Sequence, residues 1–329
     1  MAFENVNRER LQTALDRAFA EPNPVRQRRT RAVVIVHRGR IVAERYATGI
    51  GPDTPLPGWS MTKSVMNALA GILVKEGRLS TDAPVPVAEW QRPGDPRGRI
   101  TLDHLLRMSS GLRFDEDMTN PLADVTYMLL GVSNMASYAA KKELEAAPGT
   151  KWQYSSGGSI IIARLMRSVL ADDREYLRLP RRALFDRIGM TGATLEADAS
   201  GTFVGSSFMY ATARDWARFG LLYLQDGVWE GQRILPEGWV AYTRSPTPAD
   251  PRKRYGAHFW LDVPDEYRRT DGSLPSDAFH AVGHEAQFVT IVPSHEAVIV
   301  RLGLTRYPDA WDHAAFVREM LAALGPVRE

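Results

Sequence analysis

Ser60-Met61-Thr62-Lys63 opens the most informative stretch of this sequence, because an apolar segment predicted to be a helix follows it over residues 64–74. Residues three apart on a helix lie on the same face, so the serine hydroxyl and the lysine amine can meet. A serine hydroxyl is a weak nucleophile until a base removes its proton. A lysine can be that base when burial or a nearby charge lowers its pKa. The spacing predicts that Ser60 is an acylated nucleophile and Lys63 its base.

The motif has a plain structural alternative, in which Ser60 only caps the helix by accepting backbone N–H groups. The chain contains six lysines, and Lys63 is the only one that stands three residues after a serine. The Gly-x-Ser-x-Gly pattern of another large group of serine hydrolases is absent. There is also no P-loop and no Gly-x-Gly-x-x-Gly that follows a strand.

Composition narrows the class of protein. With 329 residues and 44% hydrophobic content, the chain can bury a large core, which we expect to divide into two lobes. The net charge is only +2, and the basic run at 26–31 is expected to be a solvated edge rather than a nucleic-acid site. Because cysteine is absent, disulfides, thiol catalysis and thiolate metal sites are excluded.

Nothing in the sequence indicates export or a membrane. Residues 1–21 are predicted to form an amphipathic helix without the apolar core of a secretory signal. No stretch approaches the roughly 20 apolar residues of a membrane span. We therefore expect a cytoplasmic protein with a small-molecule substrate, no nucleic-acid partner and no membrane partner. The oligomeric state cannot be read from the sequence.

The order of elements predicts an α/β fold of the α+β type. A hairpin signal near the N-terminus, strand signals in the last third and helix signals between them indicate one antiparallel sheet made by both ends of the chain, covered by helices. The expected strands are 32–36, 41–46, 257–263, 279–282, 287–292 and 297–302. The expected helices are 101–108, 159–170, 211–224 and 310–324, besides the one after Ser60. We expect residues 1–80 and 205–329 to form the α/β domain, residues 81–204 a mostly helical domain, and the active site to lie between them.

Two further segments can complete a Ser–Lys site. Tyr154 stands before four small residues and could pass a proton if a cation such as Lys63 lies nearby, although a partly buried packing role is the alternative. The segment 283–287, Gly-His-Glu-Ala-Gln, enters a strand whose N–H groups could stabilise an oxyanion, and His284 could line the site. His280 and His284 lack the His-Glu-x-x-His pattern, so we expect neither zinc nor another cofactor.

These motifs in this order resemble the serine β-lactamase and penicillin-binding protein superfamily. The likeness is strongest to its class C β-lactamase-like branch, with the family VIII carboxylesterases and the 6-aminohexanoate-dimer (nylon oligomer) hydrolases. Besides Ser60 to Lys63, the matching segments are 105–112, 148–157, 211–220 and 283–303. The resemblance implies that Ser60 is the nucleophile, Lys63 its base and Tyr154 the proton donor to the leaving group. It also implies an oxyanion hole made by the backbone N–H groups of Ser60 and Gln287.

The sequence departs from the β-lactamase pattern at the residues that contact substrate. Ser156 replaces the asparagine of the Tyr-x-Asn motif, and His284 and Ala286 replace the lysine and glycine of Lys-Thr-Gly. A substrate carboxylate thereby loses a cationic partner. Met118 stands where nylon-oligomer hydrolases often carry a tyrosine that protonates an amide leaving group.

The resulting expectation is a serine hydrolase that cleaves small carboxylic esters, and some amides, through an acyl-enzyme. The alternatives are a β-lactamase or D-Ala-D-Ala peptidase, and a non-catalytic homologue that only binds a ligand.

Overall fold

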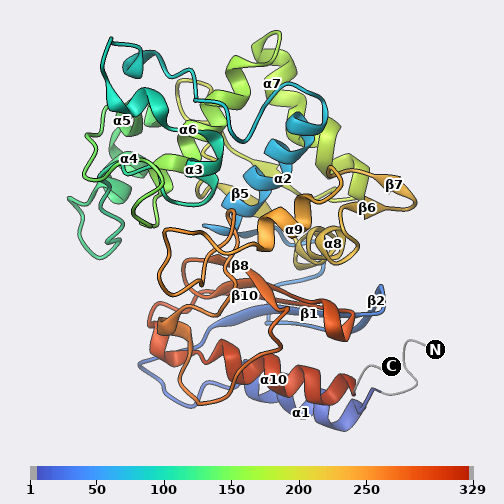
Figure 1. The fold of residues 1–329 in the computed structure, drawn as a ribbon. Coiled ribbons are helices and arrows are strands. Elements are labelled where there is room, and N and C mark those ends of the chain that lie inside the picture. Colours follow the sequence, from blue (N-terminus) through green and yellow to red (C-terminus); the bar gives the residue numbers. More distant parts are fainter. Residues whose placement is uncertain (1–5, 326–329) are drawn as a thin grey trace.

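The computed structural model describes residues 6–325, and its centre is a five-stranded antiparallel sheet in the order β2-β1-β10-β9-β8 (Figure 1). The strands are β1 (Thr30–His37), β2 (Arg40–Tyr46), β8 (Phe279–Gly283), β9 (Gln287–Val292) and β10 (Ala297–Gly303). Because β1 pairs with β10, the two ends of the chain build one sheet. This is the mixed architecture with an antiparallel sheet that the sequence predicts.

Helices cover both faces of this sheet (Figure 1). They are α1 (Arg8–Phe19) and α10 (His313–Leu324) on one face and α8 (Ala213–Leu224) on the other. Successive side chains of a strand point to opposite faces. Val33 and Ile35 of β1 accordingly join the core with α1 and α10, whereas Val34 and Val36 join the larger core that contains α8. Burial on both faces explains why this strand is a continuous apolar run.

Helix α2 (Met61–Lys75) lies between the sheet and the helical part of the molecule, and its side chains from Met61 to Leu73 are all buried. Polar groups fix its position. The side-chain oxygen of Asn67 accepts hydrogen bonds from Tyr223 Oη at 2.6 Å and Trp239 Nε1 at 2.9 Å. The Nδ1 atom of His258 lies 2.8 Å from the Lys63 carbonyl. Because α2 is held along its length, the residues at its N-terminus are held in one place.

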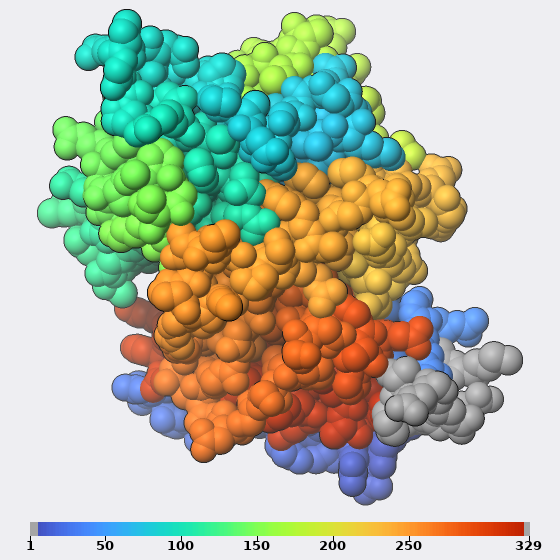
Figure 2. Space-filling model, in the orientation of Figure 1, coloured from blue at the N-terminus to red at the C-terminus, as the bar shows by residue number. Residues whose placement is uncertain are grey.

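The chain between α2 and α8 is mainly helical, and Figure 2 shows residues from about 100 to 190 gathered at one end of the molecule. The helices not yet named are α3 (Leu102–Leu106), α4 (Asp124–Gly131), α5 (Met135–Ala140), α6 (Ser156–Ser168), α7 (Asp173–Leu179) and α9 (Trp239–Arg244). The short 3-10 or π turns are η1 (Ala88–Trp90), η2 (Pro96–Arg99), η3 (Pro180–Phe185), η4 (Asp186–Ile188), η5 (Asp265–Tyr267), η6 (Pro293–His295) and η7 (Pro308–Ala310).

Two small sheets were not predicted from the sequence. Strands β3 (Leu56–Pro57), β5 (Met209–Ala211) and β4 (Thr194–Leu195) form one, and β6 (Val228–Trp229) and β7 (Gln232–Arg233) form the other. Strands of two or three residues carry too little periodicity to be recognised. The division into a 1–80 and 205–329 domain and an 81–204 domain stays a prediction.

One predicted strand, 257–263, is wrong. In its place the chain forms isolated bridges, with Trp260 paired to both Tyr255 and His280. His258 has a positive φ of 56°, which is incompatible with a continuous extended strand. The segment therefore turns inward, and its side chains reach α2. Its apolar residues are buried for that reason and not because they belong to the sheet.

The other predicted elements appear with shifted ends, and residues 1–5 of the predicted N-terminal helix lie outside the described part. Across residues 6–325, no helix has the length and apolar character needed to cross a membrane.

Candidate active site

Ser60 and Lys63 meet at the N-terminus of α2. Ser60 immediately precedes the helix, Lys63 lies in its first turn, and Lys63 Nζ donates to Ser60 Oγ at 2.9 Å. The Ser60 side chain makes no capping hydrogen bond with the helix backbone, so the structural alternative raised by the sequence is not observed. The Ser60 N–H lies at the positive end of the helix dipole, where negative charge is stabilised.

The ammonium group of Lys63 is buried, with 1% of the residue exposed. Its other hydrogen bonds go to Ser156 Oγ and to the Ser206 carbonyl, both at 3.1 Å. Burial disfavours the charged form and lowers the pKa of Lys63 to about 8, while the negative charge of Glu116 acts in the opposite direction. At pH 7 roughly a tenth of such a group is neutral, so Lys63 can accept a proton from Ser60.

Tyr154 lies against the same pair. Its ring centroid is 4.8 Å from Lys63 Nζ, and its hydroxyl hydrogen-bonds with Ser60. The ring stacks on Trp260 at 5.7 Å and meets Tyr255 edge-on at 5.9 Å. Burial raises the pKa of Tyr154, with the Ser60 hydrogen bond opposing that change, so the phenol is protonated at neutral pH. Tyr154 is therefore placed to donate a proton.

Glu116 is a residue of this site that the sequence analysis missed. Its carboxylate accepts hydrogen bonds from the Ser156 backbone N–H and from Ser156 Oγ, the second at 3.1 Å. Ser156 Oγ also receives the Lys63 hydrogen bond, so one hydroxyl joins the amine to the carboxylate. Burial raises the pKa of Glu116, and the charge of Lys63 opposes that rise. Glu116 stands in an acidic run, Asp115 to Asp117, that has the pattern of a solvated loop, so no sequence signal marks it.

Met118 lies on the same loop and is 37% exposed, whereas Glu116, two residues earlier, is the residue that reaches Ser156. Contact of Met118 with substrate stays a prediction. Ser156 is the first residue of α6 and is buried, with its hydroxyl between Glu116 and Lys63. The structure thus brings Ser156 to the site as predicted from the sequence and places an acidic group beside it.

The β8–β9 turn lies against the segment that leads into Ser60. A Cβ atom on Gly283 would be 2.2 Å from the Gly58 carbonyl oxygen, so the two backbones approach as closely as glycine allows. The His284 ring meets the Trp59 ring edge-on, with centroids 5.4 Å apart. Desolvation lowers the pKa of His284, which favours a neutral imidazole. His284 therefore borders the site without supplying the fixed cation of a lysine.

The backbone N–H of Gln287 points into the sheet. The His280 N–H donates to the Trp260 carbonyl, and the His280 carbonyl accepts from the Trp260 N–H, so both backbone groups of this β8 residue face Trp260. Backbone groups of successive strand residues point to opposite sides, so Gly283 faces β9, where it pairs with Gln287. In that register the Gln287 N–H is directed at the Gly283 carbonyl. His284 stands four residues after His280, and strand residues an even number apart point their backbone groups to the same side. The His284 N–H is therefore directed away from β9, at the open edge of β8.

Ala286 does not line the site. It is fully buried in the core formed with α1 and α10, and its N–H donates to Tyr267 Oη at 3.2 Å. The expectation that it contacts substrate is therefore wrong. The sequence could not show this, because the direction of a side chain in a turn depends on backbone angles that are set by the tertiary contacts.

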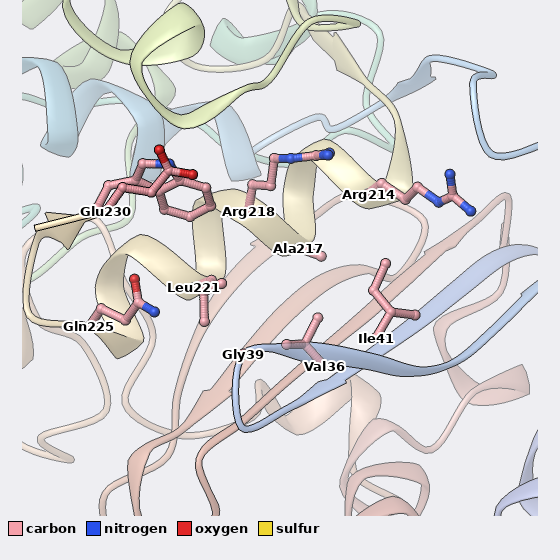
Figure 3. A pocket seen from close by; sticks show the side chains of 10 residues that line it. Val36, Gly39, Ile41, Arg214, Ala217, Arg218, Leu221, Gln225 and Glu230 are labelled. Atoms are coloured by element: carbon pink, nitrogen blue, oxygen red, sulfur yellow. The ribbon is translucent and has the colours of Figure 1, made fainter. Parts of the chain in front are cut away.

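A cavity of about 600 Å³ opens beside Tyr154 and Glu116. Its other lining residues are Arg113, Phe114, Asp115, Leu122, Asp124 and Gln153. A second cavity, of about 420 Å³, lies between the β1–β2 hairpin and α8 and contains none of the predicted residues (Figure 3). Among residues 6–325, no group of three or more His, Asp or Glu side chains is arranged to hold a metal ion.

Comparison with known proteins identifies relatives that match most of the chain. The family model described as beta-lactamase matches residues 15–323. The 6-aminohexanoate-dimer hydrolase of Paenarthrobacter ureafaciens is 23% identical over 305 residues, which are 85% of this chain and 74% of that protein.

Two solved structures share the fold. The octameric penicillin-binding protein homologue from Pyrococcus abyssi has a TM-score of 0.73 at 17% identity, covering 96% of this chain and 77% of that one. EstCE1, described as a hydrolase with promiscuous acyltransferase activity, has a TM-score of 0.73 at 14% identity, covering 96% and 98%. Since the family model spans most of the sequence, the chain belongs to the beta-lactamase family, within the serine β-lactamase-like superfamily.

Proposed function

We propose that this protein is a serine hydrolase that cleaves small, uncharged carboxylic esters, and amides more slowly, through an acyl-enzyme on Ser60. The observation that carries the proposal is the 2.9 Å hydrogen bond between the buried Lys63 amine and the Ser60 hydroxyl. Relatives named as a 6-aminohexanoate-dimer hydrolase and as a hydrolase with acyltransferase activity are consistent with acyl chemistry at this site.

In the proposed acylation step, neutral Lys63 takes the proton of Ser60 as Oγ bonds to the substrate carbonyl carbon. The carbonyl oxygen becomes negative and is stabilised by the Ser60 N–H at the start of α2. The second donor was expected at Gln287. Because the Gln287 N–H faces Gly283, we propose that the His284 N–H, at the open edge of β8, fills this role.

Collapse of the tetrahedral intermediate breaks the bond to the leaving alcohol. Tyr154 donates its proton to the leaving oxygen and is reprotonated from Lys63, which returns the amine to its neutral form. Water then attacks the acyl-enzyme, giving its proton to the same pair, and the carboxylic acid and free Ser60 are released. The contact of Lys63 with the Tyr154 ring and the hydrogen bond of Tyr154 with Ser60 support this route.

The charges around the site favour uncharged acyl groups over substrates that carry a carboxylate. Glu116 lies beside Ser156, and His284 is held toward its neutral form. A β-lactam or a peptidyl-D-alanine carries a carboxylate, which would meet the negative charge of Glu116 and would find no fixed cation at position 284. The β-lactamase or peptidase reading is therefore the second candidate.

Replacing Ser60 and Lys63 tests the mechanism. We expect Ser60→Ala to reduce hydrolysis of p-nitrophenyl acetate and butyrate to the uncatalysed rate, because no acyl-enzyme can form. Lys63→Ala should lower kcat by about a thousandfold, the usual scale for losing a general base. Ser80→Ala, at an exposed serine beyond α2, is the matched control and should keep full activity.

The same proteins should be tested on a linear amide and on nitrocefin. Nitrocefin turnover that rivals ester cleavage would favour the β-lactamase reading. A fluorophosphonate adduct on Ser60 without turnover of any acyl substrate would indicate a non-catalytic binding protein. Wild-type ester turnover by Ser60→Ala would exclude the mechanism altogether.

A further inference from the structure

The turn between β8 and β9 has a demanding backbone. Glu285 and Ala286 have φ values of 60° and 63°, so two consecutive residues that are not glycine adopt the left-handed conformation. Such conformations cost free energy and persist only where surrounding contacts impose them. Gln287 supplies one set of contacts, since its Nε2 donates to the His284 carbonyl at 3.1 Å and to the Glu285 carbonyl at 3.2 Å.

Arg301 of β10 supplies the other set. Its side chain is fully buried, and Nη1 donates to the Ala286 carbonyl at 2.8 Å and to the Glu285 carbonyl at 3.3 Å. Nη2 donates to Thr30 Oγ1 at 3.0 Å and to Thr305 Oγ1 at 2.7 Å. One end of the guanidinium therefore holds the turn, and the other end is anchored in the sheet.

Arg301 forms no ion pair with the part of the chain that the structure describes. Within residues 6–325 no carboxylate lies within 4.0 Å of its guanidinium, which stacks over the Trp311 ring at 4.4 Å. Burial lowers the pKa of Arg301 to about 9. The negative charge of Glu21 acts on Arg301 only from beyond ion-pair distance, so burying this cation is costly. A neutral side chain could hydrogen-bond the same carbonyls. The positive charge therefore calls for an explanation beyond holding the turn.

Peptide geometry connects this charge to the acyl site. The Ala286 carbonyl that accepts from Arg301 belongs to the same peptide unit as the Gln287 N–H. That N–H is directed at the Gly283 carbonyl, which shares its peptide unit with the His284 N–H. Hydrogen bonds in a chain polarise one another, and a charged donor at the start strengthens those that follow. The His284 N–H at the open edge of β8 is the last donor of this chain.

We propose that Arg301 is the positioning residue of the oxyanion site. It holds the β8–β9 turn and polarises two hydrogen-bonded peptide units, so that the last N–H of this chain, that of His284, is a stronger donor to the negative oxygen of the intermediate. This inference rests on the proposed function, in which the His284 N–H faces the reacting carbonyl.

The test compares Arg301→Gln with Arg301→Lys, measuring kcat, KM and the affinity for an alkyl boronic acid that forms a tetrahedral adduct with Ser60. The glutamine can still hydrogen-bond the turn but carries no charge. We expect it to lower kcat by about 10- to 100-fold, part of the effect of losing a whole oxyanion donor, with KM within about threefold. Boronate affinity should fall by a similar factor. The lysine keeps the charge and should retain most of kcat.

A purely structural role predicts something else. Thr305→Val removes a partner of Nη2 and leaves Nη1 on the Ala286 carbonyl, so it should lower Tm without changing kcat. If folded Arg301→Gln loses stability but keeps wild-type kcat and boronate affinity, the proposal is overturned. Equal loss of kcat in the glutamine and lysine variants would also overturn it, because charge would then be irrelevant.

A measurement on the wild type keeps the proposal testable if both variants fail to fold. The amide protons of Gln287 and His284 should resonate downfield of the other turn amides in a ¹H–¹⁵N spectrum, and ordinary positions for both would reject the polarised chain. The proposed function is tested separately: turnover that survives Ser60→Ala rejects the mechanism, whereas Ser60-dependent turnover with an inert Arg301 rejects only this inference.

Discussion

At the scale of single residues, the site is a set of groups that adjust one another's pKa. Burial makes Lys63 a weaker base than a free lysine, and Glu116 partly restores its affinity for a proton. Ser156 stands between them, with one hydroxyl in contact with both. Replacing the usual asparagine by serine therefore leaves room for a carboxylate next to the general base. Activity at neutral pH should depend on this carboxylate.

Glu116→Gln should move the acidic limb of the kcat/KM profile to lower pH. The negative charge of Glu116 raises the pKa of Lys63, which lies near 8, so removing that charge lowers the pKa and increases the neutral fraction at pH 7. The profile for an uncharged ester, measured from pH 5 to 9, shows the change. Asp117→Asn, on the same exposed loop, is the control and should leave the profile unchanged. A shift to higher pH in Glu116→Gln would contradict the assigned sign.

At the scale of elements, the site depends on the approach of β8 to the segment before α2. This approach is possible because Gly283 has no side chain, and it brings the first turn residue, His284, next to Trp59. The apolar runs of β8, β9 and β10 predict these strands from sequence, because burial on both faces leaves an unbroken pattern. The same apolar pattern wrongly predicts a strand at 257–263. There the apolar residues are buried because the chain turns inward and packs on α2.

Gly283→Ala should reduce activity far more than stability. The added Cβ would lie 2.2 Å from the Gly58 carbonyl, so β8 and the Ser60 segment must separate. A displacement of about 1 Å in a catalytic group can cost about 100-fold in rate, and we expect a loss of kcat on that scale. Gly51→Ala is the matched control, because its Cβ would meet only Thr54 Oγ1 at 3.9 Å. Equal activity of the two variants would show that the close approach is not required.

At the scale of the whole molecule, the core contains histidines held in the neutral form. His280 Nδ1 lies 2.9 Å from Thr290 Oγ1, which lies 2.8 Å from His313 Nε2 on α10. Burial lowers the pKa of His280 to about 3 and that of His258 likewise to about 3. Protonation of these rings is therefore compatible with the unfolded chain and not with the folded one.

Stability should fall as the pH is lowered from about 6.5 toward 3. Within this range the unfolded state binds more protons than the folded state, so each buried histidine reduces the free energy of unfolding by up to about 1.4 kcal/mol per pH unit. Urea unfolding between pH 7.5 and 4.5 measures the slope. His280→Asn should reduce the slope, whereas His295→Asn, on the turn η6, should not. An unchanged slope in His280→Asn would show that its burial does not control acid stability.

The order of elements and the sheet built from both ends could be predicted from the sequence alone, and so could the proximity of Ser60, Lys63 and Tyr154, whose catalytic roles stay a proposal. These follow from local spacing, from apolar runs and from motifs that need no knowledge of distant contacts. Only the folded structure shows that Glu116 reaches Ser156, that Ala286 is buried and that the Gln287 N–H faces Gly283. The same holds for Arg301, which stands 15 residues from the turn it holds. The direction, burial and hydrogen-bond partners of these groups depend on which distant segments fold together. Local sequence patterns do not contain that information.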